Sequence, residues 1–167
     1  MSRPVGIPGE LIEKLDKAAA EKQLIHKEFT KLKAKKPKDL DSRFTELHRK
    51  AFAKIDCLAC ANCCKTTSPI FRDVDIKRIA KRLKMRESEL ISYYLRMDED
   101  GDYVLKSSPC VFLQDDNKCS IYEDRPLACR EYPHTDRKNM YQILGLTEKN
   151  TEVCPAVAEI ALGLINK

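Results

Sequence analysis

The sequence predicts a mainly α-helical fold, in which an N-terminal helical hairpin precedes a small helical domain with a short β-hairpin. Three observations lead to this prediction. Apolar residues recur at alternating steps of four and three along several long segments, as they do on one face of a helix. The proline-containing run Lys35-Lys36-Pro37-Lys38 separates the first two of these segments. Strand-like residues form only short runs, mostly between residues 103 and 122.

The N-terminal region, residues 1–54, is expected to form the helical hairpin. Its first helix runs from Glu10 to about Lys35, and its second begins near Asp39 or Asp41, either of which can cap the free amides. The two apolar stripes consist of Leu11, Leu15, Ala18, Ile25, Phe29 and Leu32, and of Leu40, Phe44, Leu47, Ala51 and Ile55. We interpret the hairpin as scaffold. A stripe this narrow also suits a coiled-coil seam, which would make the hairpin an arm for a protein partner.

Residues 55–167 are expected to pack as one domain. Asp73 stands where it can cap a helix. The predicted elements are helices over 73–84 and 87–96, strand-like segments at 103–105, 111–113 and 120–122, a single helical turn at 127–130 and a final helix opening at 154–155. Turn residues at 114–118 join the last two strand-like segments into the predicted hairpin. Residues 140–146 fit a strand and a helix equally well.

Length and composition describe a soluble globular protein. The chain has 167 residues, of which 43% are hydrophobic and 34% charged, and this is long enough to bury a real core. No apolar run approaches the length of a membrane span. The first residues lack the apolar core of a secretory signal and lead directly into charged residues. We therefore expect a cytoplasmic protein that does not enter a membrane.

The cysteines form the most informative pattern in the sequence. Cys57, Cys60, Cys63 and Cys64 fall within eight residues, and Cys110, Cys119, Cys129 and Cys154 are spread through the second half. Three cysteines spaced C-x2-C-x2-C are typical of iron–sulfur proteins, and each C-x2-C pair is equally the spacing of a zinc knuckle. The pattern predicts that these eight thiols bind iron, as a cluster, or zinc, and that the metal staples the domain. Disulfides are the alternative, which a reducing compartment disfavours.

The adjacent pair Cys63-Cys64 bears on the number of metal centres. Neighbouring side chains point to opposite faces of a strand, and about 100° apart on a helix. Two consecutive thiolates therefore seldom converge on one tetrahedral ion. The pair predicts two metal centres or one multinuclear cluster, with the distant cysteines completing the coordination.

The positive charge of the chain gives little support for nucleic-acid binding. The formal net charge is +5, but this count treats thiols as neutral. If all eight thiols ligate two divalent ions as thiolates, the net charge falls to about +1. Aromatic residues that would stack on bases do not interleave with the lysines of the N-terminal helices. The partners we expect are metal ions and, through the N-terminal helices, a protein.

The cysteine-containing motifs resemble those of a known family. They are Cys57-x2-Cys60-x2-Cys63-Cys64, Ser108-Pro109-Cys110-Val111-Phe112-Leu113, Lys118-Cys119-Ser120-Ile121-Tyr122, the run from Arg125 to Pro133 around Cys129, and Cys154-Pro155. Together they resemble the YkgJ-type cysteine-cluster proteins, also described as the CxxCxxCC zinc- or iron-chelating domain. The resemblance implies eight metal-directed cysteines. A related cysteine cluster occurs in flagellin lysine methylases, where it looks like an iron–sulfur site.

Residues beside the cysteines are candidates for supporting the metal. Four thiolates around a divalent ion leave a net charge of −2, which is costly to bury without nearby donors and cations. Lys65, Arg125 and Arg130 lie close enough in sequence to supply them, and Tyr122 and Tyr132 are expected to pack over the site.

Two further function classes stay open beside a metal-binding module with a redox or metal-handling role. One is an enzyme that uses an open metal site, with methyl transfer as an analogy only. The other is a zinc-knuckle adaptor for protein or nucleic acid. The sequence contains no phosphate-binding glycine loop or dinucleotide fingerprint, and no convincing nucleophile with a base.

Overall fold

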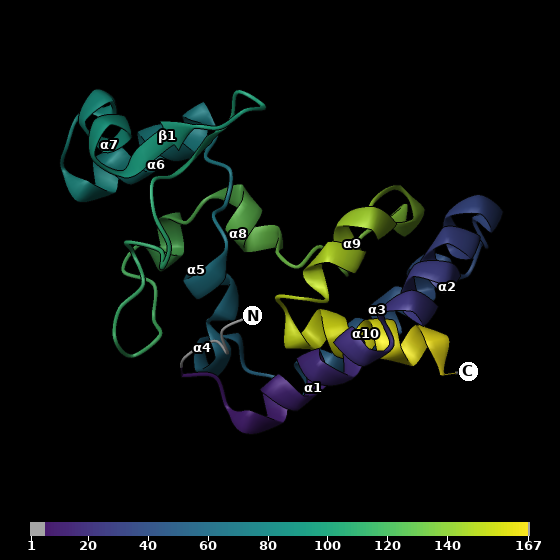
Figure 1. Cartoon of the computed structure of the whole chain (residues 1–167). Helices are drawn as coiled ribbons and strands as arrows, with labels where there is room; N and C mark the ends of the chain where they lie inside the picture. Colours follow the sequence, from purple (N-terminus) through teal and green to yellow (C-terminus); the bar gives the residue numbers. More distant parts are fainter. Residues whose placement is uncertain (1–5, 167) are drawn as a thin grey trace. The chain divides into compact units, whose positions relative to one another are not determined.

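The computed structural model describes residues 6–166, which form two compact units. The helical unit comprises residues 6–60 and 133–166, and the inserted unit comprises residues 61–132. The chain thus leaves the helical unit after Cys60 and returns to it at Pro133. The described residues as a whole are mainly helical, with one small antiparallel sheet, which confirms the predicted fold class (Figure 1).

The helical unit is built around its last helix. Its elements are α1 (Gly9–Ala20), α2 (Lys22–Lys35), α3 (Leu40–Phe52), α4 (Cys57–Cys60), η2 (Met140–Gln142), α9 (Leu144–Asn150) and α10 (Pro155–Ile165). Helix α10 packs against α1, α2, α3 and α9. It approaches α3 closely at Gly163, where an added Cβ would lie 2.7 Å from Cδ2 of Leu47. An apolar helix in the centre, covered by amphipathic ones, accounts for the burial of both predicted stripes.

The first predicted helix is two helices. Helix α1 ends at Ala20 and α2 begins at Lys22, because Glu21 adopts φ −95° and ψ 15°. The apolar stripe continues across this break, with Leu11 and Ala18 buried from α1 and Ile25, Phe29 and Leu32 buried from α2. The predicted stripe is therefore correct although the helix is interrupted.

The inserted unit combines short helices with the sheet. Its elements are α5 (Asn62–Thr66), α6 (Asp73–Leu83), α7 (Glu87–Tyr94), β1 (Leu95–Met97), β2 (Tyr103–Leu105), η1 (Tyr122–Asp124) and α8 (Leu127–Glu131). Strands β1 and β2 pair antiparallel, with Arg96 opposite Val104. A second apolar core lies within this unit, formed by Phe71, Ile76, Ile79, Ala80, Leu90, Leu95, Leu105, Phe112 and Ile121.

The β-hairpin is present but uses other residues than predicted. Strand β2 was predicted, and its partner β1 occupies the end of the segment that we expected to be helical. The expected pairing of residues 111–113 with 120–122 is reduced to one bridge between Leu113 and Cys119. Residues 95–97 are strand because Leu95 turns into the second core, where it is 2% exposed, and its backbone pairs with Leu105.

The predicted helix caps are also different. Asp39 precedes α3 but makes no side-chain capping bond, and the Asp41 carboxylate instead accepts hydrogen bonds from the amides of Asn139 and Met140. Asp73 is the first residue of α6 and not its cap. No helix within residues 6–166 is both long enough and apolar enough to cross a bilayer.

Candidate metal centre

The eight cysteines divide between the two units. Cys57, Cys60 and Cys154 belong to the helical unit, and Cys63, Cys64, Cys110, Cys119 and Cys129 belong to the inserted unit. None of the eight forms a disulfide bond. Each unit therefore contains its own set of thiols, which we describe separately.

The thiols of the helical unit lie at helix ends. Cys57 and Cys60 are the first and last residues of α4, and Cys154 precedes α10. Cys60 is part of the first apolar core and Cys154 packs against that core. Burial raises the pKa of Cys154 to about 12, and the charges of Cys57 and Cys60 add to the effect. The three thiols are therefore close enough to interact electrostatically.

The thiols of the inserted unit come from separate segments that backbone hydrogen bonds join. The amide of Cys110 donates to the carbonyl oxygen of Cys64 at 2.7 Å. The amide of Leu113 donates to the carbonyl oxygen of Cys110 at 3.0 Å, and Leu113 forms the bridge with Cys119. Backbone hydrogen bonds and one bridge thus connect the segments that contain Cys64, Cys110 and Cys119.

These thiols also influence one another electrostatically. Burial raises the pKa of Cys110 to about 11, and the pKa rises further through the charges of Cys64 and Cys119. Burial likewise raises the pKa of Cys129 to about 12, with contributions from Cys64, Cys110 and Cys119. Cys129 lies in α8, 65 residues after Cys64 in the sequence, so the fold brings distant thiols together.

Backbone amides are aimed at several of the sulfur atoms. The Cys110 sulfur accepts hydrogen bonds from the amides of Phe112 and Leu113, and these bonds act to lower its pKa. The Cys154 sulfur accepts from Ala156 and Val157 in the same way. The amide of Ile121 does so for Cys119. In every case the donor lies two or three residues after the cysteine, in a tight turn that favours the thiolate. Amide donors of this kind orient thiolate ligands and stabilise them when they bind a metal.

The side chains of Cys63 and Cys64 interact with each other. The Cys63 thiol hydrogen-bonds to Cys64 and lowers the pKa of Cys64 to about 7, against the opposing effect of burial. The charge of Lys65 lowers the pKa of Cys64 further, as expected for a cation beside a thiolate. Whether the two thiols serve one metal atom or two stays a prediction.

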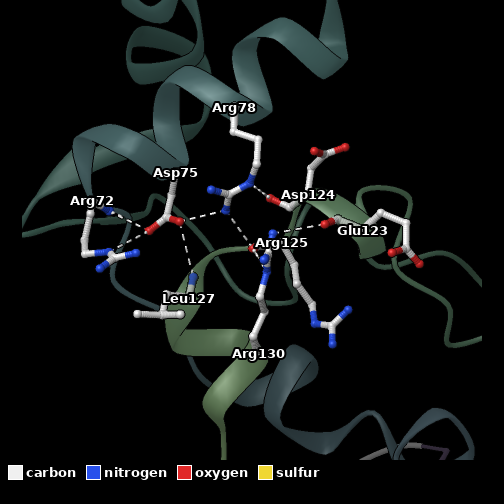
Figure 2. Close-up of polar contacts among 8 residues, drawn as sticks. All are labelled: Arg72, Asp75, Arg78, Glu123, Asp124, Arg125, Leu127 and Arg130. Carbon is white, nitrogen blue, oxygen red and sulfur yellow. Dashed lines mark hydrogen bonds and ion pairs between the residues drawn. The ribbon is translucent and has the colours of Figure 1, made fainter.

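The two predicted arginines act mainly on the backbone. The Arg125 guanidinium lies over the Tyr122 ring, 3.8 Å from its centroid, and donates to the Tyr122 carbonyl oxygen at 2.7 Å. Its charge still acts to lower the pKa of Cys119 and Cys129. Arg130 donates to the carbonyl oxygens of Glu123 and Arg125, at 3.0 and 3.1 Å (Figure 2). Tyr122 is 45% exposed.

Sequence reasoning missed two residues beside Cys129. Asp75 and Arg78, both in α6, contact the segment that leads into α8. An arginine three residues after an aspartate is a common helix-surface pair, so only the burial of Asp75 distinguishes it. The ion pair between Asp75 and Arg78, three residues apart, could be expected from the sequence. The hydrogen bond from the amide of Leu127 to Asp75, 52 residues apart, could not.

The chemistry of the donor atoms fits zinc or iron, although the sulfur atoms do not converge on one position in the described residues. Within residues 6–166, no three His, Cys, Asp or Glu side chains are arranged as a finished metal site. The fit is in the chemistry: soft sulfur donors, amides aimed at them, and the cations Lys65 and Arg125 nearby.

These features define a class of thiol-rich helical proteins with cysteines clustered for metal chemistry. The chain belongs to the CxxCxxCC family, whose model is described as "Putative zinc- or iron-chelating domain" and matches residues 56–155. All eight cysteines fall inside this range.

One relative is itself without an assigned function. It is an uncharacterised protein of Methanocaldococcus jannaschii, 33% identical over 82 residues. The match covers 47% of this chain and 44% of that protein, so the chain spans less than half the length of this curated relative. No solved structure matches the chain.

Proposed function

We propose that this protein binds iron or zinc through its eight cysteines, at two thiolate sites. The first site uses Cys57, Cys60 and Cys154 of the helical unit. The second uses Cys64, Cys110, Cys119 and Cys129 of the inserted unit, with Cys63 beside it. Membership of a family described as zinc- or iron-chelating supports the metal, and the division of the thiols between the units supports two sites.

The amides aimed at the sulfur atoms carry this proposal. A cysteine that serves only as a small apolar residue has no need of amide donors at its sulfur. Here Cys110, Cys119 and Cys154 each accept from amides that follow them in the chain. Because both units contain such cysteines, both offer amide donors that would stabilise thiolates once a metal binds.

The identity of the metal decides the role of the protein. Cysteines spaced C-x2-C-x2-C, and a ligand cysteine followed by proline as in Cys154-Pro155, favour an iron–sulfur cluster. A bound cluster would supply one-electron redox chemistry. Zinc would instead stabilise the fold, since structural zinc contributes on the order of 10–16 kcal/mol of binding energy coupled to folding. Reduced thiols are required in either case, and for this reason we propose a cytoplasmic location.

A second candidate function follows from the number of thiols in the helical unit. A tetrahedral ion held by Cys57, Cys60 and Cys154 alone would keep its fourth position for another ligand. Catalytic metal sites use three protein ligands in this way, whereas structural sites use four. An enzyme that activates a small molecule at this position is therefore the alternative to a metal-binding module without catalysis.

Metal analysis of the purified protein tests the proposal. The full chain is purified without oxygen, and its zinc, iron and acid-labile sulfide are measured together with its visible spectrum. Iron with equimolar sulfide and broad visible absorbance indicates a cluster, and zinc with no colour indicates a structural site. A chain that contains neither metal, and takes up neither Zn²⁺ nor Fe²⁺ with sulfide after reduction, would disprove the proposal.

A further inference from the structure

We propose that Asp75 and Arg78 form a clamp that positions Cys129 for metal binding in the inserted unit. Neither residue is a metal ligand. They act through the backbone of residues 124–127, which lie between Cys119 and Cys129. The inference rests on the proposed function, because it assigns these two residues to the second of the two thiolate sites.

Asp75 is a fully buried carboxylate whose oxygens all accept hydrogen bonds. The residue is 0% exposed. Its Oδ2 accepts from the backbone amide and Nε of Arg72, each at 3.2 Å, and its Oδ1 accepts from Nη2 of Arg78 at 2.7 Å. Oδ1 also accepts from the backbone amide of Leu127 at 3.3 Å (Figure 2). Burying a carboxylate is costly unless it is paired and hydrogen-bonded, and here both conditions are met.

The bond to Leu127 caps the helix that contains Cys129. Leu127 is the first residue of α8, and the residue before it, Pro126, has no side chain that can cap a helix. Asp75 therefore supplies from α6 the carboxylate that a local capping residue would otherwise supply. Because α8 has only five residues, its own hydrogen bonds cannot hold it, and this external cap matters more than it would for a long helix.

Arg78 extends the clamp to the turn before α8. Its Nε donates to the carbonyl oxygen of Asp124 at 3.2 Å, and its Nη2 donates to that of Arg125 at 2.9 Å. With the bonds from Arg125 and Arg130, each of the four consecutive carbonyl oxygens from Tyr122 to Arg125 accepts from a guanidinium group. Asp75 orients Arg78 for this task by binding the same Nη2. The turn is thus fixed along its whole length by arginine donors.

This arrangement sets the path of the chain between two thiols. Cys119 lies in the bridge with Leu113, and Cys129 lies in the middle of α8. Loss of the Asp75 carboxylate would release both the first amide of α8 and the guanidinium that holds residues 124 and 125. Cys129 would then have to be ordered by the metal itself, so metal affinity would fall. Loss of a group that orients a ligand typically lowers metal affinity about 10- to 100-fold.

A matched control exists in the same unit. Arg86 and Glu89 repeat the local pattern at the start of α7: the Glu89 carboxylate accepts from the Arg86 amide at 2.8 Å and from Nη2 of Arg86 at 2.9 Å. Both members of this pair are partly or largely exposed, with side-chain exposures of 81% and 34%. The Glu89→Gln variant therefore weakens a capping pair without touching the clamp.

The experiment compares metal binding by Asp75→Asn, Glu89→Gln and the unchanged full chain. Each metal-free, reduced protein is titrated with Co²⁺ in competition with a chelator, without oxygen, and thiolate charge-transfer absorbance is recorded. Asp75→Asn should lower the affinity of one site about 10-fold or more and leave the other within twofold. Glu89→Gln should change neither. Equal affinities in Asp75→Asn and the unchanged chain would overturn the inference.

Two further measurements keep the result decisive. Arg78→Lys retains the charge but cannot donate to two carbonyl oxygens from one planar group, so it should reproduce the loss of affinity if Asp75→Asn does not fold. Amide hydrogen exchange in metal-free protein should become faster over residues 122–131 in Asp75→Asn and not in Glu89→Gln. If the unchanged chain binds no Co²⁺ and takes up neither Zn²⁺ nor Fe²⁺ with sulfide, the proposed function fails. If it binds but neither clamp variant differs from it in affinity or exchange, the clamp fails.

Discussion

The backbone amide of Cys110 donates a 2.7 Å hydrogen bond to the carbonyl oxygen of Cys64. This bond joins the compact N-terminal cysteine motif to the first of the distant cysteines, 46 residues further along the chain. The two cysteines are therefore neighbours through their backbones. Cys154 belongs to the helical unit, where it packs against the apolar core.

Single cysteine substitutions should therefore remove metal from one site at a time. We expect Cys119→Ser to abolish binding at the inserted unit and Cys154→Ser to abolish binding at the helical unit, each leaving about half of the metal bound. The reason is that each unit contains its own thiols, and a serine hydroxyl is a poor ligand for soft metals. Metal analysis of both variants, purified without oxygen, checks this. Complete loss of metal in either single variant would show one shared cluster instead.

Metal uptake should release protons. The pKa of Cys110 is raised to about 11, and those of Cys129 and Cys154 to about 12, in each case mainly by burial. These thiols are protonated at pH 7 in the metal-free protein, and metal binding requires thiolates, so three protons must leave from these residues alone. Cys64, with a pKa of about 7, contributes less than a full proton.

Calorimetry can count these protons. Zn²⁺ is titrated into reduced protein in buffers of different ionisation enthalpy, and the slope of the observed enthalpy against that of the buffer gives the number released. We expect at least three protons per fully loaded chain at pH 7. A slope near zero would mean that the buried cysteines do not take part.

The helices were predictable from sequence wherever an apolar stripe made them amphipathic. Helices α3, α6 and α10 begin within a few residues of their predicted starts, because their stripes face the two cores. The sheet was less predictable. Residues 95–97 continue an apolar helical pattern in the sequence, and only pairing with β2 makes them a strand. Tertiary pairing overrides local preference in such short segments.

The candidate ligands of the site could be predicted from the sequence, but the groups that hydrogen-bond to them or to the neighbouring backbone could not. Spacing identified the eight cysteines, and the family match includes all of them. Amides aimed at the sulfur atoms depend on local turns that no spacing encodes. Arg125 and Arg130 were expected to support the thiolates as cations, and the structure shows that they also donate hydrogen bonds to the backbone carbonyl oxygens of residues 122, 123 and 125.

The stability of the helical unit should fall in mild acid because of His48. Burial lowers the pKa of this residue below its ordinary value of about 6.5, although the charge of Asp136 opposes the shift. A lowered pKa means that the folded state binds a proton less readily than the unfolded state. The contribution is therefore fully present above about pH 6.5 and is lost as the pH falls toward the lower folded value. The Nδ1 of His48 lies 2.8 Å from the hydroxyl of buried Thr135.

Thermal unfolding of variants checks the role of His48. The midpoint of His48→Gln should change less between pH 7.5 and pH 5.5 than that of the unchanged protein. His26→Gln serves as the control, because the His26 side chain is 68% exposed and contacts Glu148 at the surface. Asp136→Asn should make the unchanged histidine still harder to protonate, so the pH dependence should increase. An identical pH dependence in His48→Gln and the unchanged protein would exclude this residue as its source.

Removal of the metal should loosen one segment before the rest of the protein. In residues 106–132 the buried side chains are those of Phe112, Ile121 and Pro126, whereas the helical unit buries a large set of apolar residues around α10. A segment with so little apolar burial depends on its other contacts, here the thiolate site and the arginine-bound turn. Chelation under reducing conditions should therefore accelerate amide exchange across residues 106–132 by at least 10-fold, while amides of α3 and α10 change little. Exchange that accelerates equally in both units would show instead that the metal stabilises the whole chain as one cooperative structure.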